Sequence, residues 1–106
     1  FEAPGTDTWH GRRARINSVI SAHNGWLALY DGGRTFYDTY EEWCGLAWSD
    51  DGTRFERLEQ KEPWVRSPYG CVRYVFALER PSAIYFYYEF TRVDGSHDLR
   101  VSVVNR

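Results

Sequence analysis

The sequence predicts an all-β protein made of short antiparallel strands, and three observations support that fold class. No stretch of the 106 residues carries apolar side chains at the i, i+3, i+4 spacing of a helix for three turns. Short runs rich in β-branched and aromatic residues instead alternate with turn signals, and aromatic residues make up 18% of the chain. The third observation is that these runs occur twice, in the same order.

Seven strands are expected, at residues 15–21, 26–31, 45–49, 55–58, 73–78, 84–90 and 99–104. The connections between them carry residues typical of tight turns. Asn24-Gly25 and Asp51-Gly52 suit the positive φ angles of hairpin loops, and Pro81 and Gly95 mark two further hairpins.

The runs repeat with a regular spacing. Residues 15–20 and 26–31 align without gaps on residues 73–78 and 84–89, an offset of 73 − 15 = 58 in both runs. The third strand also matches, with Leu46 aligned on Leu99 at an offset of 99 − 46 = 53. Antiparallel four-stranded units that repeat every ~40–50 residues are typical of propeller blades. We therefore expect about two four-stranded antiparallel blades, at 9–60 and 61–106, the second without its fourth strand.

In this interpretation residues 1–106 form a single partial propeller unit. Each face of a blade needs a neighbouring blade to cover it, and a closed ring usually needs ~4–8 blades. The chain does not begin with Met, and we favour a piece of a longer protein over a self-assembling half-propeller. A two-sheet β-sandwich is the alternative fold.

Charge and hydropathy exclude several classes of partner. With 13 basic and 15 acidic residues, the net charge of −2 provides no basic excess for a phosphate backbone, so no nucleic acid is expected. No apolar run approaches the ~20 residues that span a bilayer, so no membrane partner is expected. Cys44 and Cys71 are either two buried thiols, the favoured interpretation, or one disulfide.

The repeat also predicts where polar side chains meet. If the first two strands of each unit pair about the centre of their loop, Arg15 lies opposite Asp31, and Arg73 lies opposite Glu89. Both units then place an arginine–carboxylate pair at the same end of the sheet. The other residues expected at that end are Glu41, Glu42, Tyr74, His97 and Asp98, with Trp9 and His10 reaching it from a loop.

Two interpretations of this cluster are open. The ion pairs stabilise each repeated sheet, or the cluster forms a carboxylate-rich cleft. Such a cleft suits a sugar, because carboxylates bind hydroxyl groups and aromatic faces stack on C–H surfaces. Cleavage of a glycosidic bond needs in addition one protonated and one ionised carboxyl group, ~5–9.5 Å apart.

Five segments carry a resemblance to a known family. They are Tyr30-Asp31-Gly32, residues 45–52, Val72-Arg73-Tyr74-Val75, Tyr87-Tyr88-Glu89 and residues 94–100. Together they resemble the C-terminal blades of five-bladed β-propeller glycoside hydrolase-like proteins, the broad group that includes the arabinanase/xylosidase and invertase-type families. The resemblance extends over nearly the whole chain from about Trp9. It implies part of a five-bladed β-propeller with an acidic site at the mouth of its central channel.

The chain departs from that family at one place. A carboxylate often opens an innermost strand in those proteins, whereas Arg15 and Arg73 occupy the corresponding positions here. The resemblance therefore implies that a general base lies in blades outside this sequence, or that another acid has taken its role.

The cluster and the resemblance together predict part of a carbohydrate-active β-propeller, a glycoside hydrolase that acts through acidic residues. The predicted catalytic residues are Glu42, Glu41 and Glu89, with Glu42 or Glu41 as the general acid. The predicted substrate-binding residues are Asp31, Arg73, Tyr74, His97, Asp98, Trp9 and His10.

The expected partners are a carbohydrate and the remaining blades, from the same longer protein or from another chain. No cofactor and no metal are expected, because the sequence does not place a third ligand beside the histidines. The alternative functions are a non-catalytic glycan-binding propeller and a structural or assembly fragment.

Overall fold

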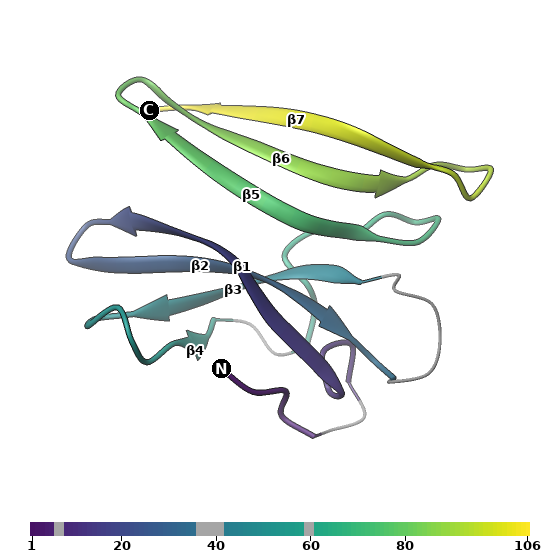
Figure 1. Cartoon of the computed structure of the whole chain (residues 1–106), viewed down its shortest axis with the longest axis horizontal. Helices are drawn as coiled ribbons and strands as arrows, with labels where there is room; N and C mark the ends of the chain where they lie inside the picture. Colours follow the sequence, from purple (N-terminus) through teal and green to yellow (C-terminus); the bar gives the residue numbers. More distant parts are fainter. Residues whose placement is uncertain (6–7, 36–41, 59–60) are drawn as a thin grey trace.

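Two antiparallel sheets make up the computed structural model of this chain, which describes residues 1–5, 8–35, 42–58 and 61–106 (Figure 1). The first sheet contains, side by side, β1 (Arg13–Ala22), β2 (Gly25–Gly33), β3 (Trp43–Ser49) and β4 (Glu56–Arg57). The second contains β5 (Val72–Arg80), β6 (Ala83–Thr91) and β7 (His97–Asn105). The described residues contain no helix, so the all-β prediction is confirmed, and all seven predicted strands are present.

The strand register confirms both predicted pairs. Arg15 lies opposite Asp31 where β1 pairs with β2, and Arg73 lies opposite Glu89 where β5 pairs with β6. Each pair sits in the half of its hairpin that lies away from the turn. In that half, residues equally far from the centre of the loop lie opposite each other, as predicted from the sequence.

Both first strands then bulge at equivalent places. β1 gains one extra residue between Ile16 and Ser18, and β5 gains one between Arg73 and Phe76. The second bulge contains Tyr74, which has a φ angle of 57°. A bulge bends its strand and re-aims the neighbouring side chains, so the repeat includes this local distortion as well as the strands.

The register corrects the alignment of the third strands. Leu46 lies opposite Leu29, whereas the residue opposite the equivalent Tyr87 is Val101 rather than Leu99. The structural offset of this strand is therefore 101 − 46 = 55, not 53. Matching leucine to leucine in the sequence placed the second copy two residues out of register while keeping the side chains on the same face.

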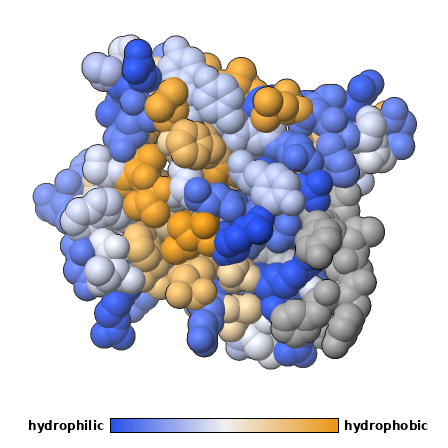
Figure 2. Space-filling view, viewed as in Figure 1, coloured by the Kyte–Doolittle hydropathy of each residue, from blue (hydrophilic) through white to orange (hydrophobic). Residues whose placement is uncertain are grey.

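The main core lies between the two sheets. Its buried residues are Ile20, Leu29, Cys44, Val72, Val75 and Ala77. Aromatic side chains of β6, namely Phe86, Tyr88 and Phe90, pack against them from the second sheet. Hydrophobic residues also gather in the upper and central parts of the face seen in Figure 2. Cys44 and Cys71 are both buried thiols, as the favoured interpretation predicted.

A second, smaller core covers the other face of the first sheet. The N-terminal segment runs beneath this sheet (Figure 1) and places Trp9 against Ala28, Tyr30 and Ala47. Trp9 and Tyr30 stack with their ring centroids 5.7 Å apart. The N-terminal segment therefore closes one side of the molecule.

Side chains and backbone groups link the first strands of the two sheets, β1 and β5. The backbone N–H of Ala77 donates to Ser18 Oγ at 3.0 Å, and the backbone N–H of Ser21 donates to Glu79 Oε1 at 3.0 Å. An N–H group on the outer edge of a strand has no ladder partner. These bonds satisfy two such groups and fix how the sheets sit on each other.

Candidate functional site

Asp31 lies at the centre of the predicted cluster and is fully buried. Its carboxylate accepts hydrogen bonds from the backbone N–H of Tyr74 at 3.0 and 3.3 Å, and from Arg15 Nη2 at 3.1 Å. Burial raises the pKa of Asp31, and these donors act in the opposite direction. The Asp31 carboxylate on β2 thus accepts a hydrogen bond from the bulge of β5, which belongs to the other sheet.

The ring of Tyr74 joins the two arginine–carboxylate pairs. The guanidinium carbon of Arg15 lies 5.3 Å from the ring centroid, and that of Arg73 lies 4.7 Å from it. Arg73 donates from Nη2 at 2.8 Å and from Nε at 3.2 Å to Oε1 of Glu89. The structure therefore brings the two predicted pairs to the same end of the molecule, around one aromatic ring.

Glu42 is a buried acidic residue of the cluster. It directly precedes β3, and only 5% of its surface is exposed. Its carbonyl accepts the N–H of Val72 at 3.0 Å. Among the described residues, its Oε1 atom has no hydrogen-bond partner. Burial raises the pKa of Glu42, and the nearby charge of Asp31 raises it further against the effect of neighbouring arginines.

Glu42 also lines a cavity of about 390 Å³ at the N-terminal side of β1. Arg12, Arg13 and Arg15 line the same cavity, together with Glu2. Arg12 and Arg13 are not among the site residues predicted from the sequence. They precede the repeated run, so the repeat carries no signal for them. The cavity combines a carboxyl group that retains its proton to higher pH with a strongly basic wall.

Glu89 and His97 lie together beyond Arg73. His97 Nδ1 is 3.9 Å from Glu89 Oε1, and both side chains are about one-third exposed. Asp98 lies apart from them. It pairs with Arg100 Nη2 at 3.2 Å and with Arg92 Nη1 at 3.7 Å.

Trp9 and His10 lie in a turn before β1, as expected, but both are buried. Trp9 is 7% exposed and stacks on Tyr30. His10 Nδ1 is 2.8 Å from the Tyr30 hydroxyl group, and burial lowers the pKa of His10. The two residues help to form the second core, and neither ring offers an open face to a sugar. Glu41 lies outside the described residues.

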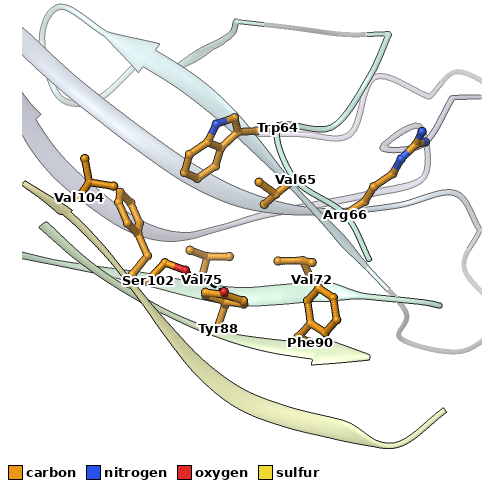
Figure 3. A pocket seen from close by; sticks show the side chains of 10 residues that line it. Trp64, Val65, Arg66, Val72, Val75, Tyr88, Phe90, Ser102 and Val104 are labelled. Atoms are coloured by element: carbon orange, nitrogen blue, oxygen red, sulfur yellow. Dashed lines mark hydrogen bonds between the residues drawn. The ribbon is translucent and has the colours of Figure 1, made fainter. Parts of the chain in front are cut away.

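A separate apolar groove lies between segment 64–66 and the second sheet (Figure 3). Its volume is about 290 Å³. Trp64 packs edge-on against Phe86 at 5.6 Å and remains 46% exposed. Ser102 and Val104 of β7 close the far side, where the Tyr88 hydroxyl bonds to Ser102 at 2.8 Å. The groove shares no lining residue with the cavity beside Glu42.

Comparison with protein-family models, with curated proteins and with solved structures finds no match to this chain in any of the three. Nor does the described part of the chain contain a helix capable of crossing a membrane.

Proposed function

We propose that this chain is part of a carbohydrate-active β-propeller in which Glu42 acts as the general acid on a glycosidic bond. One observation carries the proposal. The Glu42 carboxyl group is buried at the wall of a cavity, and its Oε1 atom has no hydrogen-bond partner among the described residues. A general acid in a glycosidase must keep its proton near neutral pH, which burial and a neighbouring carboxylate both promote.

The other acidic residues are better suited to supporting roles. Asp31 pairs with Arg15, and Glu89 pairs with Arg73. Each of these carboxylates already accepts hydrogen bonds from a guanidinium, whereas Glu42 Oε1 has no hydrogen-bond partner among the described residues. In the proposed site the charge of Asp31 raises the pKa of Glu42. The general base would come from another blade, as the arginines at the starts of the first strands suggest.

The packing of the two sheets supports the propeller architecture. Ser21 of β1 bonds to Glu79 of β5, and these two residues are equivalent in the repeat, since 79 − 21 = 58. Equivalent first strands therefore lie side by side. Innermost strands of neighbouring blades have this relationship around a central channel.

The exposed face of the second sheet supports the same architecture. Ile20 and Leu29 of the first sheet are buried against the second sheet. Their equivalents at the offset of 58 are Leu78 and Tyr87, which point away from the first sheet and are 39% and 37% exposed. The pairing Phe76–Tyr87 likewise repeats the pairing Ser18–Leu29. A face that is used for packing in one copy and exposed in the other favours a further sheet stacked in the same direction.

The test is a Glu42→Gln variant of the protein that carries this chain. Turnover would be measured on a panel of aryl and alkyl glycosides. Loss of a general acid slows poor alkyl leaving groups more than good aryl ones, because only the former need protonation. We expect Glu42→Gln to reduce turnover of alkyl glycosides by about 10²–10⁴-fold and to spare the best aryl substrates.

Glu62→Gln is the matched control, since Glu62 is exposed, pairs with Arg66 and does not line the cavity beside Glu42. Equal turnover by wild type and Glu42→Gln on all substrates would contradict the proposal. Calorimetric binding of a glycan without turnover would favour a non-catalytic glycan-binding propeller. Absence of both would favour a structural or assembly fragment.

A further inference from the structure

Three different metal-ligating side chains meet at one end of the second sheet. The ligand atoms of Cys71, Glu89 and His97 all lie within 4.8 Å of one another. Cys71 directly precedes β5, Glu89 lies near the end of β6, and His97 begins β7. Strand pairing brings them together, because Arg73 lies opposite Glu89, and His97 lies opposite Thr91.

We propose that this cluster binds a zinc ion, with Cys71 Sγ, an oxygen of Glu89 and an imidazole nitrogen of His97 as ligands. Thiolate, imidazole and carboxylate are the donors that Zn²⁺ takes in proteins, whereas Ca²⁺ and Mg²⁺ take oxygen ligands. No spacing in the sequence indicates further ligands beside His97. The fold supplies two, Glu89 from the neighbouring strand β6 and Cys71 from the residue that precedes β5.

The surroundings of the ligands resemble the outer shell of a metal site. The Thr91 hydroxyl donates to Cys71 Sγ at 3.2 Å and accepts from the backbone N–H of Cys71 at 2.8 Å. Arg73 donates twice to Oε1 of Glu89. Hydrogen bonds of this kind orient ligands before the ion arrives. Because both Arg73 bonds go to Oε1, we assign Oε2 of Glu89 to the ion.

The geometry requires only a small contraction. Ligand atoms at 2.0–2.3 Å from a tetrahedral ion lie about 3.3–3.8 Å apart. The three ligand atoms lie up to 4.8 Å apart, so the longest of these distances must shorten by about 1 Å when the ion binds. Rotation of the Glu89 and His97 side chains provides this movement. Both of these side chains are about one-third exposed, so an ion reaches the buried sulfur of Cys71 from their side.

Three protein ligands leave a fourth position for water or a small anion. Sites with three protein ligands are typical of zinc ions that remain open to exchange, whereas closed structural sites use four. The thiolate and carboxylate supply two negative charges, and Arg73 offsets one of them. This inference is independent of the proposed role of Glu42. It gives Glu89 a role other than the predicted catalytic one, and His97 a role other than the predicted binding of substrate.

The test uses the whole chain, purified without a histidine tag and under reducing conditions. Co²⁺ would be titrated first, because thiolate ligation of Co²⁺ produces an intense charge-transfer absorption in the near ultraviolet. Zn²⁺ would then be added in competition, and its affinity measured by calorimetry. We expect one ion per chain, thiolate absorption with Co²⁺, and loss of that absorption when Zn²⁺ displaces it.

Two variants and one control decide the assignment. Cys71→Ser and His97→Ala are expected to lose the Co²⁺ thiolate absorption. Cys44→Ser, which changes the other buried thiol, is expected to keep it. His97 is partly exposed, so His97→Ala decides the question even if Cys71→Ser does not fold, with circular dichroism as the check on folding.

The opposite results would overturn the proposal. Wild type without thiolate absorption, or absorption that survives both ligand variants, would show that the cluster does not bind the ion. Loss of the absorption in Cys44→Ser would show that Cys44, and not Cys71, is the sulfur ligand. Preference for Ca²⁺ over Zn²⁺ would contradict the proposed ligand set.

Discussion

The carboxylate of Asp31 in one sheet accepts the backbone N–H of Tyr74 in the other at 3.0 Å. Tyr74 occupies the bulge of β5 with a φ angle of 57°, and its N–H points out of its own ladder. Asp31 is fully buried, so it is shielded from water and bound to this strained point. One hydrogen bond therefore connects the second strand of the first unit with the distorted first strand of the second.

Asp31→Asn is expected to destabilise the chain by about 2 kcal/mol. The amide retains one oxygen acceptor, but its NH₂ group must face either the Tyr74 N–H or the Arg15 guanidinium, both of which are donors. Urea unfolding would show a lower midpoint with an unchanged slope. Glu62→Gln is the control, because Glu62 forms an exposed pair with Arg66 and its loss should change stability little. Equal effects of the two substitutions would contradict the central role of Asp31.

Glu42 predicts a particular dependence of stability on pH. Its pKa in the folded chain is raised above the ordinary value of 4.5. A carboxyl group with a raised folded pKa contributes stability that is fully present below pH 4.5. That contribution is lost as the pH rises through the raised pKa. Wild type should therefore lose this contribution from pH 4.5 upward, and Glu42→Gln should not.

The measurement is the difference in unfolding free energy between wild type and Glu42→Gln across that range. The difference removes the opposing contributions of Asp51, Glu79 and Asp94, whose pKa values are lowered in the folded chain and which stabilise it as the pH rises. A difference that is constant with pH would show that Glu42 titrates normally.

The strands and their hairpins could be predicted from the sequence because the signals for them are local and occur twice. Turn residues such as Asn24-Gly25 and alternating apolar runs mark each hairpin, and the offset of 58 marks the duplication. The pairing of Arg15 with Asp31 followed from hairpin symmetry. The third strand was misaligned because the offset depends on loop length between strands, which side-chain identity does not encode.

The candidate site could be predicted only in part, because no local signal in the sequence indicates burial or contacts between the sheets. Trp9 and His10 lie in a loop, as the sequence predicts, but no local signal shows that this loop packs under the first sheet against Tyr30. The position of Cys71 beside Glu89 and His97 depends on the pairing of three strands. No single run of the sequence contains that information.

The left-handed backbone of Tyr74 allows a test with two substitutions. Tyr74→Ala and Tyr74→Gly both remove the ring between Arg15 and Arg73, but only glycine adopts a φ of 57° without strain. Tyr74→Gly should therefore be more stable than Tyr74→Ala by about 1 kcal/mol in urea unfolding. At Phe76, after the bulge, alanine should instead be the more stable of the two, as in an ordinary strand. The same order at both positions would argue against strain at Tyr74.

Gly45 of β3 tests the packing of the second core. A Cβ atom at this position would lie 2.7 Å from Cη2 of Trp9 and would also collide with the ring of Tyr30. Gly45→Ala is therefore expected to destabilise the chain by about 3 kcal/mol, since neither buried ring can move freely. Gly95→Ala is the matched control: it has no neighbour within 4 Å but a φ of 87°, so only the backbone term of about 1 kcal/mol should appear. The free energy of unfolding of each variant, measured by heat and by urea, would distinguish the effect of a steric collision from that of backbone strain. Equal losses would contradict the close packing of the Tyr30 and Trp9 rings against Gly45.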